Sequence, residues 1–409
     1  MRIQSNTIYG ENPILYRSIS KDLKEESMNI LIVPSWYRNK VQPNNGSFFR
    51  EQAKSIADKG HNVVVLDASL RVRKGWFAKD CMRFNKEIDD NITVYSYNFP
   101  SLFFGRYPLL YCLIFSLSFK YLIKRIYKDG FNVEIVHAHS AYAAGFISSR
   151  SKIFEKIPVV VTEHNSIFNK HGIDKTLKYI LNQTIINCDK FICVSDDFAE
   201  NIHANSKDNT PITVIPNMIN PVFEFSPRRK REEFIFLSVG NLVKNKRMDL
   251  LIKAFAKKFK GDNKIKLRIV GVGHEKDNLE QLIVKEEVTN QIQLLGELDR
   301  NQLFLEYKNC DVFVLASFSE TFGLAYREAM AVGRPIVSTL NGGINSDAQA
   351  YNGKFVDVDN ENQLANALKQ MTIEIEQFDI EYISKSILEK YGEKNVINQI
   401  LECYGKLKG

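Results

Sequence analysis

The sequence predicts an α/β fold of two similar domains, each a parallel sheet covered by helices. The first reason is length, because 409 residues exceed what one hydrophobic core usually organises and favour two domains of about 200 residues. The second is that short apolar runs alternate with helical patterns, which predicts parallel strands. The third is that this alternation stops near residues 216–233 and then starts again.

The first set of elements begins at Met28–Pro34, an apolar run that predicts a strand, followed by a helix over about Phe48–Lys59. Gly60 stands directly after that helix, where glycine is preferred as a helix stop. Further strands are predicted at His61–Leu66, Val133–Ala138, Pro158–Thr162 and Lys190–Val194.

The second set follows a segment with the features of a linker. Residues 216–233 contain Pro221, Pro227 and a run of charges at 228–233. The strands predicted after it are Phe234–Val239, Lys266–Val270, Ile292–Leu295, Asp311–Leu315 and Pro335–Ser338. Two Rossmann-like halves with a cleft between them are the simplest arrangement of these elements.

Composition indicates an ordinary soluble globular protein, with 44% hydrophobic and 25% charged residues. The six cysteines lack metal-ligand spacing, so we expect reduced core thiols in a cytosolic protein. Residues 1–27 form a polar extension without the apolar segment of a signal peptide. The longest apolar stretch, Tyr107–Phe119, is shorter than the roughly 20 residues of a membrane span.

Positive charge is concentrated in the first half of the chain. Residues 1–217 hold 28 Lys and Arg against 21 Asp and Glu, whereas residues 218–409 hold 27 of each. The net charge of +7 therefore lies in the first half. It favours an anionic partner there, such as a lipid headgroup or a phosphate-linked acceptor, with an uneven solvated surface as the alternative.

The most informative segment is Ser319–Glu328, which places two carboxylates eight positions apart around a glycine turn that opens a helix. In an open α/β sheet, ligands lie beyond the carboxyl ends of strands, and the first N–H groups of a helix attract phosphate. Glu320 in the loop and Glu328 in the helix are far enough apart to bind different hydroxyl groups of one sugar nucleotide. The binding residues expected here are Ser319, Glu320, Thr321, Phe322, Gly323, Leu324 and Glu328.

A second candidate segment, Val239–Arg247, leaves a strand and enters the predicted helix Met248–Phe259. It combines Gly240 with three cations, of which Lys246 offers a mobile ammonium to a diphosphate. An ordinary solvated basic turn is the alternative.

Gly271 and Gly273 also follow a strand, at Val270. The third glycine of a dinucleotide fingerprint is replaced by Lys276, so nicotinamide binding is disfavoured. Two interpretations stay open. The glycines form either a tight turn that lets a base or phosphate approach the backbone, or a purely structural turn.

In the first half, Gly46 would allow a ligand close to the backbone, and Ser47 is a candidate helix N-cap. His164 follows a strand and should face the cleft. The pair His137 and His139 has alternate spacing, but without matching Cys, Asp or Glu residues nearby it does not favour a metal site.

The segment Tyr111–Lys128 predicts a basic, aromatic helix with Lys120, Lys124, Arg125 and Lys128 on one stripe. Such a helix can lie on an anionic membrane surface. The alternative is a domain helix that packs one face on its sheet and solvates the other.

From Met28 to its end, the chain resembles the retaining glycosyltransferases of family 4, which have the GT-B fold of two facing Rossmann-like domains. Ser319–Glu328 and its continuation to Val337 and Asn341-Gly342-Gly343 are similar to that family's E-x7-E signature. The resemblance implies that Glu320 binds the donor sugar and Glu328 the ribose. The backbone of residues 322–324 would lie against the sugar and diphosphate.

Other segments carry the same resemblance. Val239–Arg247 is similar to the family's diphosphate segment, with Lys246 in place but Asn241 where an Arg is expected, and Gly46 and His164 match first-domain positions. We expect residues 28–217 to form the acceptor domain, 218–390 the donor domain, and 391–409 a helix that returns to the first domain.

The implied reaction is transfer of a sugar from a nucleoside diphosphate, with UDP favoured over GDP, to an acceptor hydroxyl with retention. Lys246, Glu320 and His164 are the expected catalytic residues, without a metal or cofactor. The basic first half and the aromatic stretch Phe99–Phe104 fit a lipid-linked or oligosaccharide acceptor in capsule, exopolysaccharide or O-antigen synthesis.

Several alternatives stay open beside this reaction. The acceptor could be a soluble small molecule. A GT-B sugar-nucleotide epimerase and a catalytically silent binding protein are the competing functions. We expect no nucleic-acid partner, and a cytoplasmic location in which peripheral attachment to the inner membrane face stays open.

Overall fold

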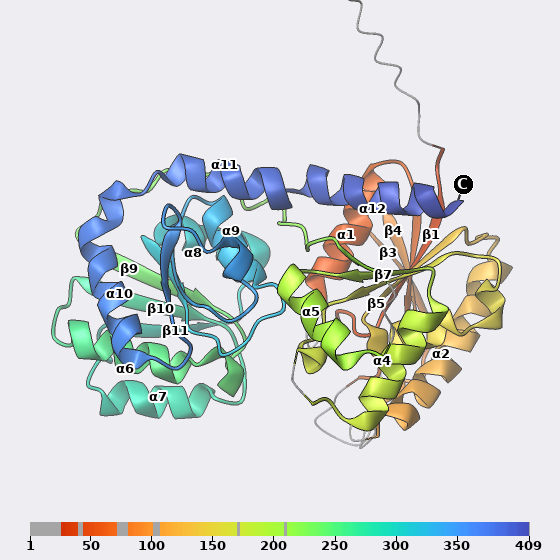
Figure 1. The fold of residues 1–409 in the computed structure, drawn as a ribbon, viewed down its shortest axis with the longest axis horizontal. Coiled ribbons are helices and arrows are strands. Elements are labelled where there is room, and N and C mark those ends of the chain that lie inside the picture. The colour runs from red at the N-terminus through yellow and green to blue at the C-terminus, as the bar shows by residue number, and fades with distance from the viewer. Residues whose placement is uncertain are drawn as a thin grey trace, which may run out of the picture.

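The computed structural model describes residues 26–39, 44–71, 81–100, 107–169, 172–207 and 211–408. It contains two sheets, one in each half of the chain, and helices cover both (Figure 1). The predicted α/β fold with two domains is confirmed.

The first sheet has eight strands in the order β3-β4-β2-β1-β5-β6-β7-β8. Its strands are β1 (Asn29–Pro34), β2 (Asn62–Asp67), β3 (Asn85–Asp89), β4 (Ile92–Ser96), β5 (Ile135–His139), β6 (Val159–Glu163), β7 (Lys190–Cys193) and β8 (Ile212–Val214). The helices of this domain are α1 (Ser47–Asp58), α2 (Pro108–Lys128), α3 (Phe146–Ser149), α4 (Lys175–Asn187) and α5 (Asp196–Asn205).

The central strand β1 is buried on both faces, as expected for a parallel sheet covered on two sides. Ile30 and Ile32 belong to one hydrophobic cluster, which includes residues of α1 and α12. Leu31 and Val33 belong to the other cluster, together with residues of α2. The alternation of a strand thus assigns neighbouring residues of one apolar run to opposite layers.

The second sheet has six parallel strands in the order β11-β10-β9-β12-β13-β14. They are β9 (Phe234–Val239), β10 (Ile265–Val270), β11 (Ile292–Gly296), β12 (Val312–Leu315), β13 (Ile336–Thr339) and β14 (Gly353–Val356). The helices that follow or cover them are α6 (Met248–Phe259), α7 (Lys276–Lys285), α8 (Arg300–Asn309), α9 (Leu324–Ala331), α10 (Glu361–Glu374) and α11 (Ile380–Tyr391).

The first sheet is not wholly parallel, which corrects the expectation of parallel sheets. β3 pairs antiparallel with β4, and the two strands form a hairpin that turns at Asp90, where φ is 57°. The strand β3 was not predicted, because its residues are polar and mostly exposed and no apolar run marks it. The strands β4, β8 and β14 were not predicted either.

The last helix, α12 (Glu393–Lys408), lies against the first domain. In Figure 1 it continues the line of α11 and crosses from the second domain to the first. Two chain segments cross there side by side, since the N–H of Ile219 donates to the carbonyl of Tyr391 at 2.9 Å. Tyr404 of α12 bonds His137 of β5 at 2.6 Å.

Five cysteines, Cys112, Cys188, Cys193, Cys310 and Cys403, carry free thiols. Cys112, Cys193 and Cys310 are buried, whereas Cys81, Cys188 and Cys403 are half-buried, so the expectation of core thiols holds for three of the six. In the part of the chain that the structure describes, no helix combines the length and hydropathy of a membrane span.

Candidate functional site

The loop after β12 leads into α9 through Gly323, which has a φ of 74°. A Cβ atom at this position would lie 2.5 Å from the ring of Tyr326, so both the backbone angle and the space require glycine. No side chain caps α9. The N–H of Tyr326 donates to the carbonyl of Gly323 at 3.1 Å, and the N–H groups of Leu324 and Ala325 can bind an anionic group.

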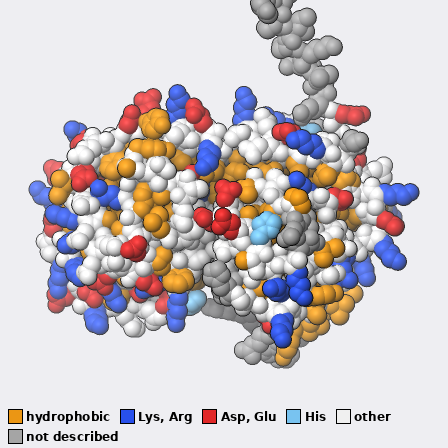
Figure 2. Space-filling model, viewed as in Figure 1, with side chains coloured by type: hydrophobic (Ala, Val, Ile, Leu, Met, Phe, Trp, Pro, Cys, Tyr) orange, Lys and Arg blue, Asp and Glu red, His pale blue; other side chains and the backbone are white. Residues whose placement is uncertain are grey.

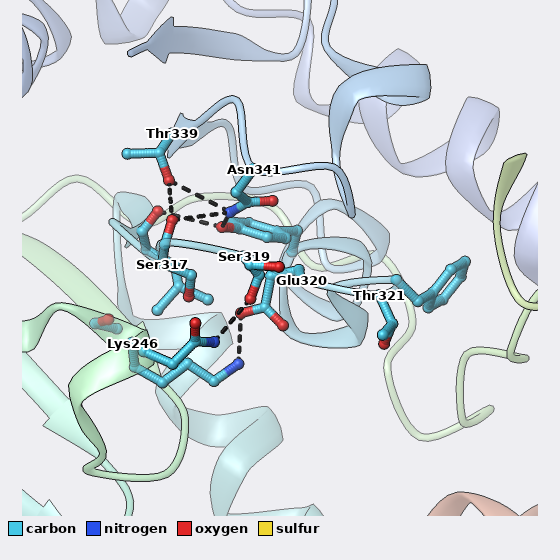
Figure 3. Close-up of polar contacts among 12 residues, drawn as sticks. Lys246, Ser317, Ser319, Glu320, Thr321, Thr339 and Asn341 are labelled. Atoms are coloured by element: carbon cyan, nitrogen blue, oxygen red, sulfur yellow. Dashed lines mark hydrogen bonds and ion pairs between the residues drawn. The ribbon is translucent and has the colours of Figure 1, made fainter. Parts of the chain in front are cut away.

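Lys246 and Glu320 meet at this loop (Figure 3). Lys246 ends a short helical turn after β9, and its Nζ lies 2.5 Å from Oε1 of Glu320. The methylene groups of Lys246 pass over Gly240, where an added Cβ would be 3.5 Å away. The two predicted segments are thus brought together by one partly buried ion pair.

Further hydrogen bonds hold the loop after β9 against the loop after β12. Asn245 donates from Nδ2 to the carbonyl of Ser319 at 2.8 Å, and the N–H of Phe318 donates to the carbonyl of Asn245 at 2.8 Å. On the other side, the N–H of Glu320 donates to the carbonyl of Asn341 at 3.0 Å. The Asn341 amide itself bonds the hydroxyl of Tyr326 at 2.8 Å.

Glu328 is 2% exposed and lies between two donors of the second domain. Arg300 donates to its Oε1 at 2.8 Å, and the Tyr307 hydroxyl donates to its Oε2 at 3.0 Å. Burial raises the pKa of Glu328, and the Arg300 guanidinium opposes that rise. The carboxylate keeps unused lone pairs for ligand hydroxyls.

Arg300 also connects the two domains. Its Nε donates to Oε1 of Glu51 at 2.7 Å, and its NH2 group donates to the Ser47 hydroxyl at 3.1 Å. Ser47 is therefore not the predicted N-cap of α1. Gly46 holds the N-cap position in a left-handed conformation, and no side chain caps the helix.

A cavity of about 240 Å³ lies beside Arg300, between the domains. Second-domain residues that follow β9, β10 and β11 form most of its wall, including Gly240, Asn241 and Gly271, and Asn44 and Ser47 line it from the first domain. Three predicted residues thus face one cavity at the carboxyl edge of the sheet. Gly273 does not line it, because its backbone packs against that of Leu242.

Gly271 brings three strand ends together. A Cβ atom there would lie 1.9 Å from the carbonyl oxygen of Gly240, and the φ of 144° also disfavours other residues. Its N–H donates to the carbonyl of Gly296 at 2.8 Å. The Gly271-Val272-Gly273 turn is therefore required by backbone packing, and it forms part of the cavity wall as well.

His164 belongs to a row of three buried histidines. Its Nε2 lies 3.1 Å from Nδ1 of His139, whose ring is next to that of His137. Phe48 and Phe49 pack against the His164 ring. Burial lowers the pKa of His137 and of His164 to about 3, so these rings are neutral near pH 7.

His137 and His139 do not form a metal site with other residues that the structure describes, where no group of three ligating side chains has a suitable arrangement. His137 instead bonds the Thr162 hydroxyl at 2.7 Å and the Tyr404 hydroxyl. The row thus connects the core under α12 to the cleft side of the sheet.

Glu163, directly before His164, has no exposed surface. One oxygen accepts the N–H groups of His164 and Asn165 and the Ser140 hydroxyl, and the other accepts the N–H of Ala141 at 2.6 Å. Burial raises the pKa of Glu163 to about 7. This carboxylate positions the loop that carries His164.

The first domain also touches the loop of Glu320. Asn169 donates to the Ser319 hydroxyl at 2.7 Å, and Ser195 donates to the carbonyl of Thr321 at 2.6 Å. The Thr321 hydroxyl donates to the carbonyl of His164 at 3.3 Å. Of the first-domain residues predicted for the site, His164 thus contacts this loop, together with Asn169 and Ser195, which were not predicted.

Arg327 lies beneath this loop and is fully buried. It donates to the carbonyls of Phe322 and Gly343, and it pairs with Asp347. The Phe322 ring stacks on its guanidinium at 3.9 Å. Phe322 is thus held from below, with its side chain away from solvent.

Several residues that organise the site were not predicted from the sequence, namely Glu51, Glu163, Asn169, Ser195, Arg300, Tyr307 and Arg327. Arg300 was the most accessible to sequence reasoning, because it begins a helix just after a predicted strand. Glu163 directly precedes the predicted site residue His164, and Arg327 lies within the segment Ser319–Glu328. The other residues carry no local signal.

Two family models match consecutive parts of the chain. Residues 46–223 match the model described as glycosyltransferase family 4, and residues 221–377 match that of glycosyl transferases group 1. Together they cover residues 46–377, which include most of both domains and every predicted site residue.

Similar proteins agree with this match. N-acetyl-alpha-D-glucosaminyl L-malate synthase of Bacillus anthracis is 26% identical over 87% of this chain and 91% of its own. Alpha-monoglucosyldiacylglycerol synthase of Acholeplasma laidlawii is 27% identical over 50% of this chain and 58% of its own.

Solved structures show the same fold. Sucrose-phosphate synthase from Thermosynechococcus elongatus has a TM-score of 0.75 at 16% identity and covers 93% of this chain and 99% of its own. HepE of Anabaena, in complex with UDP, has a TM-score of 0.68 at 17% identity, with 93% and 100% covered. The chain therefore belongs to the family 4, group 1 glycosyltransferases with the GT-B fold.

Proposed function

We propose that this glycosyltransferase moves a sugar from a nucleoside diphosphate to an acceptor hydroxyl with retention at the anomeric carbon. The ion pair between Lys246 and Glu320, beside the uncapped start of α9, is the observation that carries the proposal. A cation and helix N–H groups suit a diphosphate, while a carboxylate suits sugar hydroxyls.

In this proposal, Lys246 stabilises the negative charge that develops on the diphosphate during the reaction. As the bond to the sugar breaks, negative charge grows on the departing phosphate, and a preorganised ammonium and helix N–H groups stabilise it. The departing phosphate oxygen then takes the proton of the acceptor hydroxyl on the same face of the sugar. This scheme needs neither a protein nucleophile nor a metal ion.

The nucleoside is assigned to the cavity lined by Gly240, Asn241 and Gly271, with the ribose hydroxyls on Glu328. Asn241 supplies no positive charge, so Lys246 is the main cation for the diphosphate. UDP is the favoured nucleotide, and HepE of Anabaena, which has the same fold, was solved with UDP.

Gly46 and His164 provide the first domain's side of the donor site. Gly46 lies at the start of α1, next to Ser47 on the cavity wall. A neutral His164 ring can donate or accept a hydrogen bond with a sugar hydroxyl. Its carbonyl accepts a hydrogen bond from the Thr321 hydroxyl, so the histidine touches the Glu320 loop when the two domains are in contact.

For the acceptor, we propose a lipid-linked saccharide of surface polysaccharide synthesis, with the first domain attached peripherally to an anionic membrane. The helix α2 supports this part of the proposal. Leu113 and Leu117 are exposed on one of its faces, and Lys120 and Lys124 continue the same face. In Figure 2, hydrophobic and basic side chains gather at the lower right, where Figure 1 places α2 and α4.

The donor assignment is tested by a thermal-shift panel of nucleotide sugars. A ligand at 100 times its dissociation constant adds about 2.7 kcal/mol of stability. Incubating the best donor without acceptor then separates the functions, because an epimerase converts it and a transferase leaves it unconverted or hydrolyses it slowly. Rapid conversion of donor alone would contradict the proposal.

The membrane assignment is tested by co-sedimentation with vesicles of phosphatidylglycerol and phosphatidylcholine. The double variant Leu113→Glu/Leu117→Glu should lose binding, since it places two carboxylates on the proposed contact face. Ile373→Glu, an exposed apolar position on α10 of the second domain, is the matched control. Equal binding by the wild type and the double variant would contradict the assignment.

A further inference from the structure

We propose that Arg300 is a positioning residue that makes ribose recognition by Glu328 depend on contact between the two domains. The inference rests on the proposed function, in which Glu328 binds the ribose. Arg300 donates to Glu328 with one nitrogen and to Glu51 and Ser47 of the first domain with the others.

In the second domain, Arg300 lies at the capped start of a helix. Arg300 is the first residue of α8, which begins with a capping box between Asp299 and Gln302. Tyr307, seven residues later on the same helix, donates to the other oxygen of Glu328. Because positions seven apart share one helix face, Arg300 and Tyr307 of α8 can bind both oxygens of the Glu328 carboxylate.

In the first domain, the two side chains that accept hydrogen bonds from Arg300 lie on a single helix. Ser47 and Glu51 are four residues apart on α1 and therefore share one face. Glu51 is buried, and both of its oxygens accept N–H groups of Arg300, at 2.7 and 3.3 Å. A planar guanidinium with five donors can satisfy two carboxylates and a hydroxyl at once, which an ammonium cannot do with the same geometry.

The arrangement has a direct consequence for binding. If the domains separate, Arg300 loses Glu51 and Ser47, and its donors turn toward Glu328 or solvent. The lone pairs of Glu328 that would accept ribose hydroxyls are then no longer held in place. Discrimination between ribose and deoxyribose should therefore weaken when the Glu51 contact is removed, although Glu51 itself is not the proposed ribose ligand.

The test compares dissociation constants of ribonucleoside and 2′-deoxyribonucleoside diphosphates by calorimetry. The probe pairs are UDP with dUDP, GDP with dGDP and ADP with dADP, and the pair with the tightest ribonucleotide is used. We expect the wild type to prefer the ribonucleotide about 10- to 100-fold, as a hydrogen bond to a charged group allows. Glu51→Gln should reduce that ratio at least threefold, by weakening ribonucleotide binding while the deoxyribonucleotide constant is unchanged.

A further variant at Glu328 separates the possible outcomes. Glu328→Gln should abolish the preference, and if it keeps the wild-type ratio, Glu328 is not the ribose ligand and the proposed donor site is wrong. If Glu328→Gln abolishes the preference but Glu51→Gln keeps it, the donor site stands and the role of Arg300 is overturned.

The control is Glu306→Gln, which neutralises another Arg-paired glutamate of α8 within the second domain. It should keep the wild-type ratio. A reduction equal to that of Glu51→Gln would mean that general loosening of α8 explains the effect, and it would overturn the inference. Circular dichroism of each variant shows that the compared proteins are folded.

Discussion

The ammonium of Lys246 lies 2.5 Å from the carboxylate of Glu320, and this contact joins the loop after β9 to the loop after β12. Replacing Lys246 by Ala removes the cation assigned to the departing diphosphate. We expect kcat/KM for sugar transfer to fall about 10²- to 10³-fold, the usual effect of losing one preorganised donor to a developing negative charge. Transfer assays with the donor found in the thermal-shift panel measure the change.

Lys244→Ala is the matched control, because it removes an exposed positive charge from the same turn. Its kcat/KM should stay near that of the wild type. Equal losses in both variants would mean that the overall charge of the turn matters, and not the pair with Glu320.

Gly271→Ala should destabilise the protein strongly. Its Cβ would lie 1.9 Å from the carbonyl oxygen of Gly240, and the backbone angle is also unfavourable. We expect a loss above about 3 kcal/mol in the free energy of unfolding. Gly405→Ala in α12, where no atom lies within 4 Å of the added Cβ, should instead add about 0.5–1 kcal/mol. Urea unfolding measures both, and a tolerated Gly271→Ala would contradict the described strand-end packing.

The sequence predicted most of the fold because local patterns determine most of it. Buried strands such as β9 and the helix α6 have the predicted bounds, since each is a continuous apolar run or a clear helical repeat. The hairpin of β3 and β4 lacked such a signal. Its outer strand is held by pairing with β4 and exposes polar side chains, so tertiary context determines it.

In the candidate site, too, local patterns predicted some features and tertiary packing determined the others. The predicted positions of Glu320, Lys246 and Gly271 at one edge of the sheet follow from the rule that the carboxyl ends of parallel strands lie together, which needs no tertiary information. The pairing of Arg300 with Glu51 could not be predicted, because the two residues lie in different domains and no local pattern records the docking of α1 against α8. His164 was placed at a strand end, but its burial among Phe48, Phe49 and His139 follows from packing alone.

Glu163 should make stability depend on pH. Burial raises its pKa from 4.5 to about 7 in the folded protein. Between these values the folded state binds more protons than the unfolded state, so the free energy of unfolding falls as the pH rises through this window. Relative to Glu163→Gln, which cannot ionise, the wild type should lose roughly 2–4 kcal/mol between pH 4.5 and pH 8.

Urea unfolding of both proteins at pH 5 and pH 8 measures that difference. Other titrating groups cancel, since they are common to the two proteins. The amide of Gln makes poorer contacts with the N–H groups of His164 and Asn165, but this cost is the same at both pH values. A difference that stays constant, or that grows in favour of the wild type at pH 8, would show that the buried carboxylate is ionised throughout.

Arg327 and Asp347 form a buried ion pair beneath the donor loop. Asp347→Asn leaves the charge of Arg327, which has no exposed surface, without its carboxylate, and removing one partner of a buried pair typically costs about 3–5 kcal/mol. Because Arg327 also holds the carbonyl of Phe322, its displacement should loosen the loop of Glu320 and raise the dissociation constant of the nucleotide. The exposed pair Glu402 and Lys406 on α12 supplies the control, and Glu402→Gln should leave both quantities unchanged. If Asp347→Asn behaves like Glu402→Gln in urea unfolding and calorimetry, the carbonyls and aromatic rings around Arg327 suffice to hold it, and the ion pair has no role in positioning the loop.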